Sequence, residues 1–222
     1  MTESNKTSAD IIMAAIKGSI GAIPIMGSFI TEYISLAQQY VGDKRFVEWI
    51  SILEEKLSKL EDNLEKLAGN EFFYSCFRTA TYGAINSYQR EKREYLANAL
   101  KNSLLMIDIS EEKRLIFLSL IDRYTLLTIK ILIYYSKNIT NESDTYHDEK
   151  EVRNTDIIMN IPEIAEDIGI IDIIENQLFV DGLIEPFNLP DLNYQEQPRR
   201  KLTTDLGDEI IRFLTDTEDC CK

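Results

Sequence analysis

The sequence predicts a mostly α-helical protein, with an N-terminal helical bundle followed by a smaller module that carries two short β-strands. Apolar residues recur every three or four positions through the N-terminal half, which is typical of amphipathic helices. The polar segment from Asn138 to Asn154 lacks this period and indicates a linker or exposed loop. We therefore expect a helical domain at residues 1–140, a linker at 141–155 and a second domain at 156–222.

The N-terminal domain begins with an apolar hairpin at residues 11–37. The stretch from Gly18 to Thr31 carries no charge, but its 14 residues are fewer than the roughly 20 that a membrane-spanning helix needs. We interpret the hairpin as two short helices that meet at a proline bend and pack closely through glycine. The alternative is a membrane-active element that inserts after a trigger. Its candidate residues are Gly18, Gly21, Pro24 and Gly27.

Three further periodic stretches complete the helical domain. Residues 43–67 predict a long amphipathic helix with Gly69 as its C-terminal cap, and residues 71–105 predict one or two more. Ser110 is expected to cap a helix that continues through Tyr135. The basic cluster at residues 90–93 is interpreted as a solvated face with internal ion pairs, with a site for an acidic ligand as the alternative.

The C-terminal residues follow a recognisable order of short elements. A short helix begins at Ile161-Pro, Gly169 turns the chain, and a helix at residues 171–181 is capped by Gly182. Strands follow at 183–186 and 200–203, and a helix at 204–215 closes the module. This order resembles the winged helix-turn-helix superfamily across residues 110–216, with residues 110–137 supplying the first helix. The resemblance implies a winged-helix domain with a small two-stranded β-wing.

The charge of this region disagrees with that shape. Residues 151–222 contain 17 acidic and 6 basic residues, and the whole chain has a net charge of −14. In DNA-binding winged helices the third helix enters the major groove, where it needs basic or amide side chains. We therefore expect a protein partner or self-association and no specific nucleic acid, with a transcription regulator as the alternative. The candidate interaction residues are Asp172, Glu175, Asn176, Asp181, Arg199 and Arg200.

The whole chain is also similar to a bacterial helical family. The similarity lies in the Gly21-Ala-Ile-Pro-Ile-Met-Gly27 bend, the leucine-rich helix after it and the Glu91-Lys-Arg-Glu-Tyr-Leu-Ala-Asn98 segment. That family joins a Gly-x-x-Pro-x-x-Gly hairpin to a helical domain and often to a winged-helix end. The similarity implies a bacterial or phage origin, and an association with anti-phage defence.

The sequence offers little for catalysis. Its one histidine, His147, lies in the polar linker, and three cysteines provide neither a disulfide framework nor a zinc site. Clustered carboxylates such as Glu163, Glu166 and Asp167 are interpreted as a solvated face and not as a metal site. We expect a non-enzymatic cytoplasmic adaptor or regulator without a cofactor, metal, small-molecule substrate or constitutive membrane span.

Overall fold

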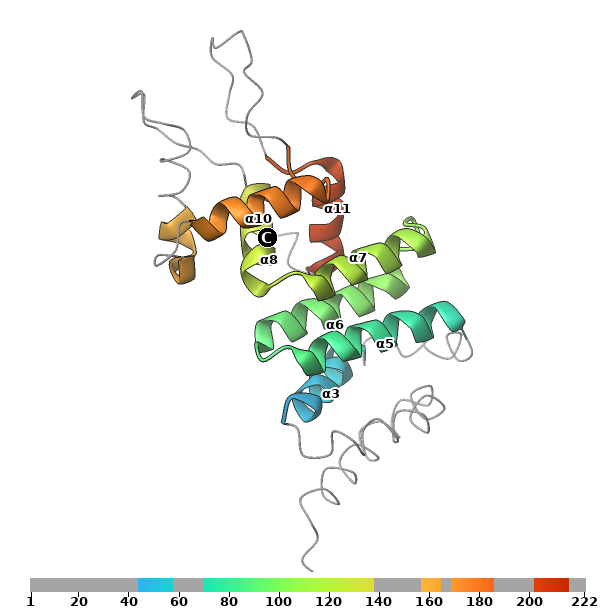
Figure 1. The fold of residues 1–222 in the computed structure, drawn as a ribbon. Coiled ribbons are helices and arrows are strands. Elements are labelled where there is room, and N and C mark those ends of the chain that lie inside the picture. The colour runs from blue at the N-terminus through green and yellow to red at the C-terminus, as the bar shows by residue number, and fades with distance from the viewer. Residues whose placement is uncertain (1–43, 58–69, 138–156, 165–168, 186–201, 216–222) are drawn as a thin grey trace, which may run out of the picture. The chain divides into compact units, whose positions relative to one another are not determined.

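The computed structural model describes residues 44–57, 70–137, 157–164, 169–185 and 202–215, and they are mostly helical, as predicted (Figure 1). Residue contacts divide the chain into two compact units, Met1–Arg123 with Phe213–Thr215 and Tyr124–Arg212 with Asp216–Lys222. The apolar hairpin at 11–37, with Gly18, Gly21, Pro24 and Gly27, lies outside the described residues. So do the predicted linker at 141–155 and the wing residues Arg199 and Arg200.

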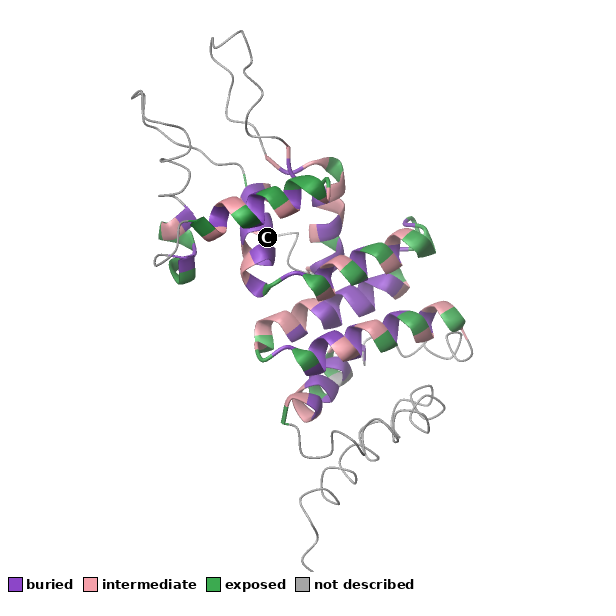
Figure 2. Ribbon diagram, in the orientation of Figure 1, coloured by how far each residue is buried: buried purple, intermediate pink, exposed green. Residues whose placement is uncertain are grey.

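Four helices form the described part of the first unit. They are α3 (Lys44–Leu57), α5 (Glu71–Asn86), α6 (Arg90–Leu105) and α7 (Glu111–Arg123). Helix α5 packs on α6 and α7, and α3 packs on α5 and α6. The facing sides of these helices are buried (Figure 2). Within this core the Trp49 indole donates a hydrogen bond of 3.1 Å to the Thr81 hydroxyl, which joins α3 to α5.

The stretch at 71–105 forms two helices because its middle contains a break. Asn70 caps the start of α5, where its side-chain oxygen accepts from the amides of Phe72 and Phe73 at 2.9 and 3.2 Å. The helix ends at Ser87, whose backbone is extended. Small residues let α5 approach its neighbours. A Cβ atom at Gly83 would lie 2.3 Å from a carboxylate oxygen of Asp122 on α7.

The prediction of one continuous helix from Ser110 to Tyr135 is wrong. The chain forms α7 and then α8 (Leu126–Ser136), separated at Tyr124 and Thr125. Thr125 has an extended backbone, and its hydroxyl accepts from the Thr128 amide at 3.1 Å, so α8 has an N-cap of its own. The apolar pattern runs across the break because both helices bury residues there, and periodicity alone therefore hides it.

In the second unit, α10 (Gly169–Val180) packs on α8. A 3-10 turn at Pro162–Ile164 precedes α10 in the chain. Gly169, predicted as a turn, is the first residue of α10. The predicted Gly182 cap is confirmed by its φ of 74°. Gly182 donates to the Phe179 carbonyl and Leu183 donates to the Leu178 carbonyl, both at 2.9 Å. These two bonds form a Schellman ending, which satisfies carbonyls that the helix leaves open.

The predicted strands appear in the described residues as an isolated antiparallel bridge between Ile184 and Thr203. The Glu185 amide donates to the Leu202 carbonyl at 2.8 Å, beside this bridge. The predicted wing tip at 187–199 lies outside the described residues. Helix α11 (Asp205–Leu214) follows directly, and its start is capped by the Thr204 hydroxyl, which accepts from the Gly207 amide at 3.0 Å.

Gly207 lies in the first turns of α11, against the chain that leaves α10. A Cβ atom there would lie 2.1 Å from the Leu183 carbonyl oxygen and 3.3 Å from the Thr203 Cβ. The obstructing atom belongs to the backbone, and the same carbonyl accepts from the Thr204 amide at 3.1 Å. Glycine is therefore required here by close approach of two chain segments, although the helix by itself would favour alanine.

We predict that Gly207→Ala destabilises the protein. Helix propensity alone would make alanine about 1 kcal/mol more stable, whereas the backbone clash should cost about 2 kcal/mol or more net. Urea unfolding measures the sign directly. Gly182→Asn is a suitable control, because asparagine tolerates a positive φ and should change stability little. An increase in stability for Gly207→Ala would contradict the close approach.

Candidate protein-interaction surface

Glu175 on α10 and Asp181, which directly follows the helix, accept hydrogen bonds from tyrosines of the same unit. Glu175 is only 6% exposed and accepts a short hydrogen bond from the Tyr135 hydroxyl on α8. Asp181 accepts from the Tyr124 hydroxyl at 2.7 Å. The exposed position expected for Glu175 is therefore wrong. A buried carboxylate needs a hydrogen-bond donor, and the phenol of Tyr135 supplies it.

The outward face of α10 is apolar. Ile173 is 67% exposed, Val180 is 81% exposed, and Phe179 and Asn176 are also exposed. Ile173, Asn176 and Val180 follow one another at intervals of three and four residues and therefore lie along one line of the helix surface. We call these three residues the outer stripe. Large apolar side chains along one line of an exposed helix are a feature of interaction sites.

The predicted interaction residues differ in how far they are exposed in the structure. Asn176 is exposed, and Asp172 and Asp181 are half-buried at the borders of the outer stripe. Glu175 is buried, and Arg199 and Arg200 lie outside the described residues. The apolar members of the surface, Ile173 and Val180, were not predicted from the sequence. Their spacing was visible, but Ile171, Ile174 and Leu178 have the same spacing and form the buried side.

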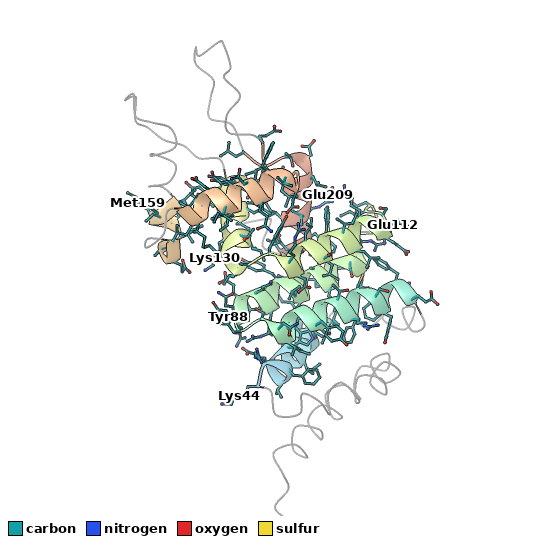
Figure 3. All side chains as sticks on the ribbon, in the orientation of Figure 1. Lys44, Tyr88, Glu112, Lys130, Met159 and Glu209 are labelled. Carbon is teal, nitrogen blue, oxygen red and sulfur yellow. The ribbon has the colours of Figure 1, made fainter. Side chains whose placement is uncertain are left out.

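The carboxylates of α10 are Asp172, which is half-buried, and Glu175, which is buried. Helix α10 contains no lysine or arginine. On α8, Lys130 is bound to Glu163 at 2.8 Å, and this hydrogen bond lowers the pKa of Glu163 (Figure 3 labels Lys130). Among the described residues, no group of three His, Cys, Asp or Glu side chains could hold a metal ion. No described helix is both long enough and apolar enough to cross a bilayer.

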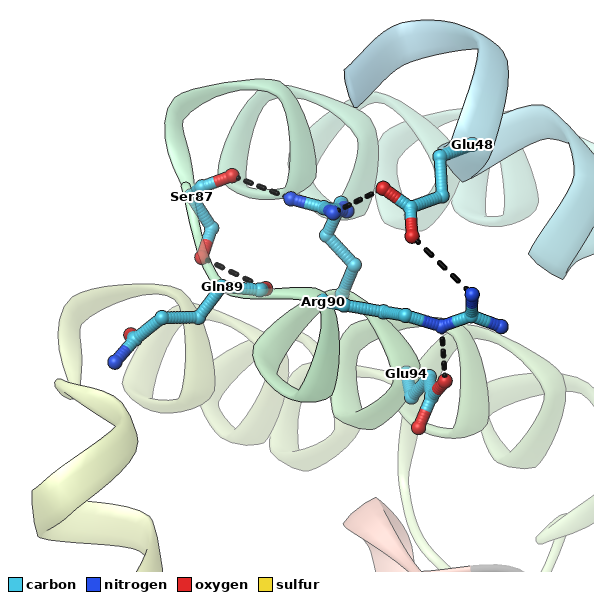
Figure 4. A network of polar contacts seen from close by, with 6 residues as sticks. Glu48, Ser87, Gln89, Arg90 and Glu94 are labelled. Carbon is cyan, nitrogen blue, oxygen red and sulfur yellow. Dashed lines mark hydrogen bonds and ion pairs between the residues drawn. The ribbon is translucent and has the colours of Figure 1, made fainter. Parts of the chain in front are cut away.

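The basic cluster of the first unit is a cross-link between helices (Figure 4). Arg93 is only 3% exposed, so the expected solvated face is wrong at this residue. Its guanidinium donates to the Ser87 carbonyl at 2.8 Å and forms a short ion pair with Glu48 on α3. Arg90 is exposed, and it pairs with Glu94 at 2.9 Å and with Glu48 at 3.4 Å. The cluster joins α3 to the end of α5.

Two more cations of this unit bind helix C-termini. Arg114 donates to the Ser103 carbonyl in the last turn of α6, and its guanidinium lies 4.5 Å from the centre of the Phe72 ring. Lys92 donates to the Asp122 carbonyl in the last turn of α7 at 2.6 Å. Burial lowers the pKa of Lys92 and raises that of the Asp122 carboxyl, and each charge partly offsets the shift of the other.

Phe213–Thr215, at the end of α11, belong to the first unit. Side chains of α6 donate hydrogen bonds to their carbonyls. The Asn98 amide donates to the Leu214 carbonyl at 3.2 Å. The Asn102 amide, one turn further along α6, donates to the carbonyls of Phe213 and Thr215, each at 2.9 Å. The last carbonyls of a helix are the ones that side chains can close, and the two asparagines donate to those of α11 as a C-terminal cap.

Cys76 lies close to one of these caps. It is fully buried, and burial raises the pKa of its thiol to about 11, although a hydrogen bond with Ser103 and the nearby Arg114 lower it in part. A protonated thiol in a closed core is a poor nucleophile. Cys76 is therefore a packing residue and no candidate for catalysis.

A comparison with protein-family models, curated proteins and solved structures finds no match for this chain.

We predict that Arg93→Met costs about 3 kcal/mol of folding free energy, because it leaves the Ser87 carbonyl and the partly buried Glu48 without this partner. Arg90→Met is the matched control. It removes the other arginine that contacts Glu48, but from a solvated position, and should change stability little. Urea unfolding of both variants checks this. Equal losses for the two variants would show that burial does not distinguish these arginines.

The raised pKa of Cys76 predicts a pH dependence. The unfolded thiol ionises near pH 9 and the folded thiol near 11, so the unfolded state loses its proton first and stability falls as the pH rises between these values. The stability of the protein relative to Cys76→Ala should shrink by about 1–3 kcal/mol across this window. Urea unfolding of both proteins at pH 8 and 10.5 measures their difference in stability. Other groups titrate alike in the two proteins, so they do not change this difference. A constant difference would contradict the shift.

Proposed function

We propose that this protein is a non-enzymatic adaptor or regulator whose C-terminal unit is a winged helix used for binding another protein. The observation that carries the proposal is the outer stripe of α10, where large apolar side chains are exposed on a helix without basic residues. A face of this kind is suited to apolar contact with a protein surface and poorly suited to a phosphate backbone.

The order of elements supports the winged-helix assignment. A 3-10 turn at Pro162–Ile164 is followed by α10, by the Gly182 turn and by the bridge between Ile184 and Thr203. Helix α10 then corresponds to the third helix of the motif, the one that DNA-binding members place in the major groove. In this chain that helix would carry the protein-binding surface instead.

We predict that a photo-crosslinking amino acid at Asn176 captures a protein in cells that produce this chain. The same residue at Tyr88, which is 80% exposed on the first unit, is the control and should capture none. Ile173→Asp should abolish the adduct at 176 because it places a charge within the apolar contact. Mass spectrometry identifies the captured protein, including a second copy of the chain.

Two results would contradict this proposal. One is the absence of an adduct that is specific to position 176. The other is binding of random duplex DNA with a Kd below about 1 µM at near-physiological salt, which would require a cationic surface.

A further inference from the structure

We draw no further inference here: the strongest candidate, the outer stripe on the exposed face of α10, belongs to the surface already described, and nothing in the structure shows what covers it.

Discussion

The described helices of the first unit depend on side chains that reach the open carbonyls at helix ends. The last carbonyls of a helix have no partner within it, and leaving them unpaired in a closed core costs free energy comparable to a lost hydrogen bond. Arg93 donates to a carbonyl at the end of α5, Arg114 donates to one at the end of α6, and Lys92 donates to one at the end of α7. Each cation also faces the negative end of a helix dipole, which offsets part of the cost of burying its charge.

This constraint explains why α6 is polar and yet largely buried. Asn98, Asn102 and Arg93 lie on a helix that packs against three others, where an apolar surface would be the simpler choice. Each of them donates to a carbonyl at the end of another helix. Asn98 and Asn102 both donate to carbonyls in the last turn of α11. Side chains from a neighbouring helix can close the carbonyls at such an end, as backbone amides do at the end of α10. The polar residues of α6 are therefore part of the core.

The sequence predicts the helices of this protein well and their connections poorly. Periodic apolar residues identify α3, α5, α6 and α10, because burial of one face leaves a local pattern. Nothing local distinguishes Arg93, which is buried, from Arg90, three residues earlier, which is solvated. The difference comes from Glu48 and Ser87, and Glu48 lies 45 residues away in the chain. Long-range partners of this kind leave no signal in a single sequence.

Helix α10 shows the same limit at the candidate surface, since a helix that is apolar on both sides does not reveal which side is outward. The buried side consists of Ile171, Ile174 and Leu178 together with Glu175, which accepts from the Tyr135 hydroxyl. With Glu175 held inward, the middle of the outer face has no charge, and Asp172 and Asp181 remain at its borders. The apparent conflict between a winged-helix pattern and an acidic helix then has a physical resolution. Glu175 and Asp181 accept hydrogen bonds from tyrosines of the same unit, while Ile173 and Val180 remain exposed.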